Sequence, residues 1–355
     1  MNHKIEVLRK KLSGQNLDGM IVSNPTNIRY LTNIEAEGIL LITRKENIFI
    51  TDSRYIEAVS KTVTIDDEII IYDMRNIRAE DYENFFMFCN SVGFEENYVT
   101  YSKYKEYICK FKIENMQETE EIIETNRIIK DETEIQKIKK ACQITDDCFM
   151  HLLKYIKKGM TEKQVAAEIE NYFKLHGAED ISFDPIVASG VNSSMPHAIP
   201  TDKKIESGDP ITIDMGCKVD GYCSDMTRTI FVESVPEDIK PIYDIVLKNQ
   251  LSTLEEYKDG GNIKIIGKLV ENNFEFNKYV LVHALGHGVG LDIHEAPIIS
   301  SKNMQQLKEN MVVTDEPGIY IPGKFGVRIE DTVLITKNGC ITLTNSEKNY
   351  IIISG

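Results

Sequence analysis

Five side chains of the kinds that bind metal ions fall in the second half of this chain, at Asp214, Asp225, His287, Glu316 and Glu330. Four carboxylates and one imidazole cannot be buried together unless cations neutralise them, because uncompensated buried charge is strongly unfavourable. An oxygen-rich set suits a pair of divalent ions better than one structural zinc. Two ions about 3.5–4 Å apart can activate water and stabilise a tetrahedral intermediate. The set therefore predicts a fold that gathers these residues around metal ions. It also predicts that the protein is a hydrolase.

The size and composition of the chain limit its class. A length of 355 residues predicts two domains on the usual scale of 100–200 residues each. With 42% apolar and 27% charged residues, the chain can build hydrophobic cores and is not expected to be disordered. A net charge of −15 and the lack of a Lys/Arg cluster argue against a nucleic-acid partner, since phosphate binding needs a basic surface.

Nothing in the sequence predicts a membrane partner. The longest apolar runs, at residues 38–42 and 69–71, are the size of strands and far too short to span a bilayer. The first residues carry charges throughout and lack the apolar core of a signal peptide. Seven scattered cysteines without a CxxC pair favour a reduced, cytoplasmic protein.

The first 125 residues are expected to form a smaller α/β domain. An amphipathic opening helix is followed by a predicted strand at 19–22. Turn residues come next, and then a short segment that fits either a helix or a strand. Residues 38–43 and 47–51 are separated by three polar residues and predict a hairpin.

Residues 126–355 are expected to form the catalytic domain, after a polar stretch that we interpret as a linker. Asp131 with Glu134 is a capping pattern that predicts a long helix to about residue 155. Thr161 with Gln164 repeats the pattern and predicts a second helix to about residue 176. Beyond residue 181 the chain consists of short β-rich segments, interrupted by a third predicted helix over 237–257.

The first motif contains Asp214 and Asp225. Asp220-Gly221 between them is typical of a type I′ turn, which places Asp214 opposite Thr227 in a hairpin. Asp225 is then a diagonal neighbour of Asp214 on the same sheet face. Two carboxylates on one face repel each other unless a cation lies between them. The alternative is a pair of solvated strand aspartates.

The second motif places His283, His287 and His294 among several glycines. His283 and His287 have the spacing of a zinc-binding helix, but Gly286, Gly288 and Gly290 make a long helix there unfavourable. We therefore expect a loop in which glycine lets the backbone approach an ion or substrate closely. A lone histidine is more often structural than catalytic, whereas three within twelve residues favour a site.

The third motif contains Glu316 before Pro317, and then Arg328 and Glu330. Proline imposes extended geometry on the residue before it. Arg328 and Glu330 are two residues apart and share a strand face, while Asp331 points the other way. An arginine beside a ligand carboxylate can orient it. The alternative is a surface hairpin with an ordinary salt bridge.

With these motifs in place, the chain resembles the pita-bread metallopeptidases of the creatinase/aminopeptidase P family, in the Xaa-Pro dipeptidase and Xaa-Pro aminopeptidase branch. The resemblance depends on DMGCKVDGYCSDMTRT, HALGHGVGLDIHEAP, DEPGIYIPG and GVRIED, and more weakly on MPHA around His197. It implies an α+β architecture. A smaller creatinase-like α/β domain at 1–125 would precede a catalytic pita-bread domain at 126–355, with a curved antiparallel sheet covered by helices.

The resemblance also implies the role of each site residue. Asp214 and Asp225 would bind one metal, and Asp225 and Glu330 would bridge toward the second. His287 and Glu316 would complete the coordination shell of the other metal, and Glu316 would also act as the general base. The remaining candidates are three histidines on the substrate side and an arginine behind the ligands: His197, His283, His294 and Arg328.

The activity implied is metal-dependent hydrolysis of the Xaa-Pro bond at the N-terminus of dipeptides or short peptides. The implied cofactors are two divalent ions, first of all Mn(II), with Co(II) or Zn(II) as alternatives, and the implied assembly is a homodimer. Two other functions compete. One is a creatinase-like hydrolase that cleaves a C–N bond without metal, and the other is a non-catalytic pita-bread binding module. Retention of all five ligands argues against both.

Overall fold

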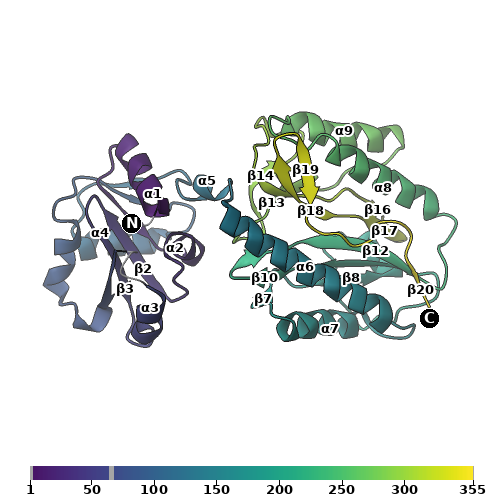
Figure 1. Cartoon of the computed structure of the whole chain (residues 1–355), viewed down its shortest axis with the longest axis horizontal. Helices are drawn as coiled ribbons and strands as arrows, with labels where there is room; N and C mark the ends of the chain where they lie inside the picture. Colours follow the sequence, from purple (N-terminus) through teal and green to yellow (C-terminus); the bar gives the residue numbers. More distant parts are fainter. Residues whose placement is uncertain (1–2, 64–67, 355) are drawn as a thin grey trace. The chain divides into compact units, whose positions relative to one another are not determined.

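The computed structural model describes residues 3–63 and 68–354, which form two compact units, Met1–Arg127 and Ile128–Gly355 (Figure 1). No helix in the described part of the chain is long and apolar enough to cross a membrane. All seven cysteines are described, and each is a free thiol.

The first unit contains a six-stranded mixed sheet with the order β4-β3-β2-β1-β5-β6. Its strands are β1 Gly19–Val22, β2 Gly38–Thr43, β3 Asn47–Thr51, β4 Ile69–Asp73, β5 Val92–Phe94 and β6 Met116–Glu118. Its helices are α1 His3–Gly14, α2 Pro25–Thr32, α3 Ile56–Thr62, α4 Tyr101–Phe111 and α5 Glu124–Arg127, with the 3-10 helices η2 Met74–Asn76 and η3 Ala79–Phe86. The combination of parallel and antiparallel pairs with surrounding helices is the α/β texture that the sequence predicts.

Local sequence explains these elements. In α1, Ile5, Leu8 and Leu12 recur at helical spacing and are buried. The strand predicted at 19–22 and the hairpin of β2 and β3 are confirmed. The segment that fitted either a helix or a strand is the helix α2, because the Asn24 side chain accepts a hydrogen bond from the Thr26 N–H and proline follows at the first turn.

The second unit has four α-helices among its described residues, α6 Glu132–Tyr155, α7 Glu162–Leu175, α8 Lys240–Leu254 and α9 Ile263–Phe276, with a 3-10 helix η4 Gly190–Ser194. Both predicted capping boxes are confirmed, at Asp131 with Glu134 and at Thr161 with Gln164. The helix predicted over 237–257 is shorter at both ends. It starts at Lys240, just before Pro241, which suits the first turn of a helix.

The strands of the second unit form small sheets, and among the described residues all strand pairs but one are antiparallel. Their orders are β11-β10-β7, β20-β12-β9-β8, β14-β13-β15-β18-β19 and β16-β17, and the exception is the parallel pair β12–β20. The bounds are β7 Asp180–Ile181, β8 Ile186–Ser189, β9 Pro210–Met215, β10 Cys217–Val219, β11 Tyr222–Cys223, β12 Met226–Val232, β13 Gly286–Gly288, β14 Glu295–Ile299, β15 Val312–Asp315, β16 Gly318–Ile321, β17 Phe325–Arg328, β18 Asp331–Thr336, β19 Gly339–Thr342 and β20 Ile352–Ile353.

Two hydrophobic cores hold the helices of this unit against its sheets. One joins α6 and α7 to β9 and β12, and the other joins α8 and α9 to β14, β15 and β18. The two helix pairs lie on different sides of the strands (Figure 1). The predicted α+β architecture, with antiparallel strands covered by helices, is therefore confirmed, and it leaves the other faces of the strands to form a site.

Candidate metal centre

Asp214 lies on β9 directly opposite Thr227 on β12, as the hairpin register predicts. The turn at Asp220 and Gly221 connects Val219 to its partner Tyr222, and its two residues have φ of 47° and 80°. Both values lie in the left-handed region that a type I′ turn requires. The turn therefore sets the register that brings Asp214 to the site.

His287 lies in the short strand β13 and not in a helix, as expected from its glycines. A side chain at Gly286 would place its Cβ 2.2 Å from the Thr314 carbonyl oxygen, so only glycine allows this approach between β13 and β15. His287 Nδ1 lies 3.1 Å from the Gly288 carbonyl oxygen. In the neutral ring this nitrogen donates, which leaves the lone pair of Nε2 available to an ion.

The carboxylates around His287 come from three different strand ends. His287 Nε2 lies 3.6 Å from Asp225 Oδ2 and 3.5 Å from Glu316 Oε1. Glu316 follows β15, where its backbone N–H donates to the Leu285 carbonyl at 2.9 Å. Glu330 precedes β18, and the Thr227 hydroxyl donates to its Oε2 at 2.7 Å.

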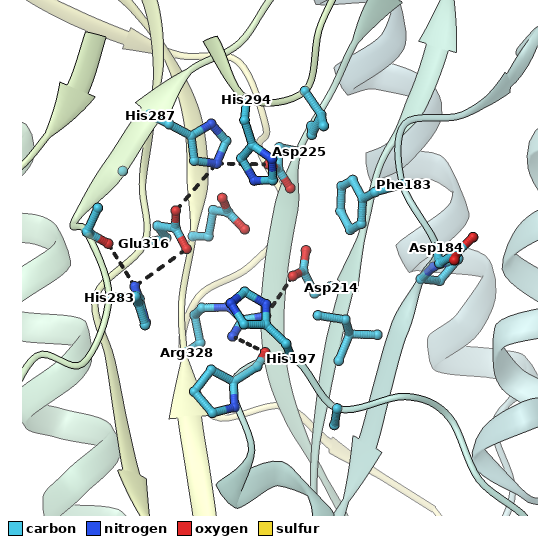
Figure 2. Close-up of a pocket in the computed structure, with 18 of the residues that line it drawn as sticks. Phe183, Asp184, His197, Asp214, Asp225, His283, His287, His294, Glu316 and Arg328 are labelled. Carbon is cyan, nitrogen blue, oxygen red and sulfur yellow. Dashed lines mark hydrogen bonds and ion pairs between the residues drawn. The ribbon is translucent and has the colours of Figure 1, made fainter. Parts of the chain in front are cut away.

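The structure gathers all the predicted site residues around one cavity of about 580 Å³ in the second unit (Figure 2). Asp225, His287 and Glu330 each offer a ligand atom within 4.8 Å of the others. Glu316 lies next to this group because its Oε1 is close to His287 Nε2. Asp214 instead accepts a hydrogen bond through Oδ2 from Arg328 Nη2 at 2.6 Å. The other oxygen of Asp214 is buried and has no hydrogen-bond partner among the described residues.

Burial and mutual repulsion alter the proton affinities of these groups. Burial, with the neighbouring Glu330, Asp214 and Glu316, raises the pKa of Asp225 well above its usual range. Burial, together with the Asp214 charge, raises the pKa of Glu316 to about 8. Burial lowers the pKa of His287 to about 4, so its imidazole is neutral at neutral pH and can bind a cation.

The three other predicted histidines differ in their contacts. Both ring nitrogens of His283 are used within the protein: Nδ1 lies 2.7 Å from the Ala284 carbonyl oxygen and Nε2 lies 3.0 Å from the Tyr320 hydroxyl. His197 and His294 are exposed and line the cavity. Figure 2 shows His197 beside Arg328 and Asp214, and His294 beside His287, whose ring centroid is 4.4 Å away.

Two site residues lie inside the motifs but were given no role from the sequence. The Tyr320 hydroxyl accepts from Arg328 Nη1 at 2.8 Å and donates to His283, so it connects the arginine to the histidine. The Thr227 hydroxyl accepts from Arg328 Nε at 3.0 Å while donating to Glu330. Thr227 could have been identified as a site residue from the sequence, because the predicted hairpin register places it opposite Asp214.

The donor set fits divalent metal ions. Asp214 has a buried carboxylate oxygen with no hydrogen-bond partner among the described residues, and a bound cation would satisfy it. Three further carboxylates crowd one imidazole, whose second nitrogen is already oriented by a backbone carbonyl. Carboxylate oxygens combined with one imidazole suit Mn(II), Co(II) or Zn(II).

Comparison with known proteins agrees with this geometry. Residues 136–337 match metallopeptidase family M24, and residues 4–129 match the creatinase/prolidase N-terminal domain. An Xaa-Pro dipeptidase of Pyrococcus horikoshii is 36% identical over 363 residues, covering 99% of this chain and 99% of the relative.

Solved structures extend the similarity to the fold. An Xaa-Pro dipeptidase from Bacillus anthracis has a TM-score of 0.92 and 37% identity, with 99% of both chains covered. An X-Pro aminopeptidase from Thermotoga maritima has a TM-score of 0.89 and 31% identity, covering 97% of this chain and all of that one. With its gathered carboxylates, its oriented imidazole and these matches along nearly its whole length, the chain belongs to metallopeptidase family M24.

Proposed function

We propose that this protein is a metal-dependent exopeptidase that hydrolyses the Xaa-Pro bond at the N-terminus of dipeptides or short peptides. The observation that carries the proposal is the convergence of Asp225, His287 and Glu330 within 4.8 Å in a cavity that Asp214 and Glu316 also line. Relatives across most of the chain are named Xaa-Pro dipeptidases or an X-Pro aminopeptidase, which supports the same substrate class.

Two divalent ions, with Mn(II) as the first candidate, are proposed to be held by five residues: Asp214, Asp225, His287, Glu316 and Glu330. When bound, such ions lower the pKa of water and polarise a peptide carbonyl. That help matters for an Xaa-Pro bond, because proline lacks an N–H and restricts the conformation of the residue before it.

The protein's own groups are proposed to move the protons and place the substrate. Glu316 takes a proton from the attacking water and later returns it to the proline nitrogen of the leaving group. His197 and His294 face the cavity and donate hydrogen bonds to the substrate carbonyl and its developing oxyanion. The resemblance implied a substrate-side role for His283 as well. Because both of its ring nitrogens are engaged within the protein, we propose instead that it fixes the Tyr320 hydroxyl and, through it, Arg328.

Three further assignments belong to the proposal. Residues 1–125 form the creatinase-like domain and residues 126–355 carry the catalysis. The protein works as a homodimer. It resides in the cytoplasm, which is consistent with seven free thiols.

The direct test is hydrolysis of Ala-Pro and Ala-Pro-Ala by metal-free and Mn(II)-loaded protein, with Ala-Ala and creatine as controls. We expect Mn(II)-dependent cleavage of a proline peptide and no cleavage of Ala-Ala. Cleavage of the dipeptide alone would define a dipeptidase, and cleavage of both an aminopeptidase. Turnover of creatine without metal, and of neither proline peptide with it, would overturn the proposal.

A further inference from the structure

Arg228 occupies a buried position behind the metal ligands that the proposed chemistry does not use. It follows Thr227 on β12, and its side chain is only 1% exposed. Its Nη1 donates to the backbone carbonyls of Thr227 and Glu330. These are the two residues whose side chains meet on the metal side, where the Thr227 hydroxyl donates to the Glu330 carboxylate.

Asp331 fixes the other end of this guanidinium. Its Oδ1 accepts from Arg228 Nη2 at 2.7 Å, and its Oδ2 accepts from Lys348 Nζ at 2.6 Å and from Gln250 Nε2 at 2.7 Å. Asp331 follows Glu330 directly, and successive side chains of an extended segment point to opposite sides. A movement of the Asp331 carboxylate is therefore transmitted to Glu330 through one peptide unit.

The segment at residues 345–348 completes the surroundings of Arg228. The Ser346 carbonyl accepts from Arg228 Nη2 at 2.8 Å, and the Glu347 carbonyl accepts from Nε at 3.1 Å. Asp146 on α6 holds this segment through the Ser346 backbone N–H at 2.9 Å and its hydroxyl at 2.6 Å. All five N–H groups of the guanidinium thus have partners, which fixes its plane.

We propose that Arg228, Asp331 and Lys348 are positioning residues that hold Glu330 in the orientation needed to bind metal, with the carbonyls of Ser346 and Glu347 completing the support. The inference rests on the proposed function, because it takes Glu330 as a metal ligand. The buried Arg228 and the partly exposed Lys348 pair with one buried carboxylate, and leaving that carboxylate or the arginine unpaired would be strongly unfavourable. Groups behind a ligand that fix its direction commonly control metal affinity.

Lys348 is the best position for a test, because its side chain is 20% exposed and can be replaced without opening the core. Lys348→Met removes the charge and keeps the aliphatic stem, whereas Lys348→Arg preserves the ion pair with Asp331. Asp331→Asn gives a second variant that keeps the shape of the carboxylate. Lys337→Met is the matched control, because Lys337 is an exposed lysine following β18 in the same unit.

The measurement is a titration of each full-length, metal-free protein with Mn(II), following free Mn(II) by electron paramagnetic resonance. We expect Lys348→Met and Asp331→Asn to raise the Kd of at least one Mn(II) site by about 10-fold to 100-fold, the usual cost of losing a group that supports a ligand. Lys348→Arg and Lys337→Met should bind as the wild type does. At saturating Mn(II), Lys348→Met should recover its kcat, with an unchanged KM.

A lower melting temperature of the metal-free Lys348→Met protein with an unchanged Mn(II) Kd would show a merely structural role and overturn the inference alone. A wild-type chain that binds no Mn(II) in this titration, and no Co(II) or Zn(II) by metal analysis, would overturn the proposed function and this inference with it. The wild-type titration therefore separates the two failures.

Discussion

Arg328 Nη2 lies 2.6 Å from Asp214 Oδ2, and the other oxygen of the same carboxylate is buried without a hydrogen-bond partner among the described residues. One oxygen is thus committed to the guanidinium, and the other faces the cavity side of the sheet, where Asp225 and Glu330 lie. A carboxylate divided in this way is held in direction while one oxygen stays available to a cation.

The first prediction concerns the guanidinium group of Arg328. It also donates hydrogen bonds to the Tyr320 hydroxyl, the Thr227 hydroxyl and the Pro196 carbonyl. Arg328→Lys keeps the charge but cannot make these contacts together. We expect kcat/KM for Ala-Pro-Ala or Ala-Pro to fall by about 10-fold to 100-fold. Arg54→Lys, at an exposed site of the first unit, is the control and should leave it unchanged. Unaltered kinetics in Arg328→Lys would contradict the positioning role.

The second prediction concerns Glu316 as the group that accepts a proton. Glu316→Gln should lower kcat by about 100-fold to 10,000-fold, the range that proton transfer by a positioned side chain contributes. Because burial and Asp214 disfavour the charged form of Glu316, the metal-free variant should melt no lower than the wild type. Glu309→Gln, at an exposed position, is the control for activity and melting. Appreciable turnover by Glu316→Gln would remove this role from the account.

A third prediction tests the approach of β13 to β15. The Cβ of Gly286→Ala would meet the Thr314 carbonyl oxygen at 2.2 Å, and that backbone atom cannot move independently of its strand. We expect a loss of about 1–3 kcal/mol in the free energy of unfolding, as for other overpacked sites, together with weaker metal binding because His287 is the next residue. Gly339→Ala, whose Cβ would have no atom of the described residues within 4 Å, should change neither quantity. Equal stability of the two variants would show that the strands separate easily.

The fourth prediction concerns pH and the first unit. Glu95 accepts hydrogen bonds from the backbone N–H groups of Ser23 and Asn24 and from the Asn27 amide, yet burial, with a further contribution from Glu124, raises the pKa of its carboxyl. The folded state therefore binds the Glu95 proton more tightly than the unfolded state does. The contribution of Glu95 to the free energy of unfolding is therefore highest below the pKa of glutamate in the unfolded chain, about 4.3, and falls as pH rises above that value.

Denaturant unfolding of the wild type and Glu95→Gln between pH 4 and pH 8 measures this effect. The free energy of unfolding of the wild type minus that of Glu95→Gln should decline as pH rises. Glu80→Gln, at an exposed site of the same unit, should show no such trend. A difference that grows with pH would mean that the hydrogen bonds outweigh burial and lower the pKa of Glu95.

Much of the fold could be predicted because it depends on neighbouring residues. The capping boxes at Asp131 and Thr161 use side chains three residues apart, and the turn at Asp220-Gly221 sets the register of Asp214 against Thr227. Both are local choices that sequence pattern records directly. The segment now seen as α2 remained ambiguous, because its eight residues are too few to show a clear period.

Contacts between distant motifs could not be read from spacing. The sequence placed His283 and Arg328 in different motifs, and nothing in either indicates that the Tyr320 hydroxyl joins them. Similarly, the alternation of Glu330 and Asp331 predicted opposite directions for their side chains. The partners of Asp331 could not be predicted in this way, because Arg228 and Lys348 come from other segments of the chain.

The measurement that tests the central claim most directly is the number of Mn(II) ions bound per chain, obtained by titrating metal-free protein and analysing the protein-bound metal. The five gathered ligands predict two ions per chain in the wild type and a loss of binding in Asp225→Asn, whose carboxylate lies 3.6 Å from His287 Nε2 and offers a ligand atom within 4.8 Å of those of His287 and Glu330. Two results would contradict the account. One is a wild-type chain that binds no Mn(II), Co(II) or Zn(II), and the other is an Asp225→Asn variant that binds these ions as well as the wild type does.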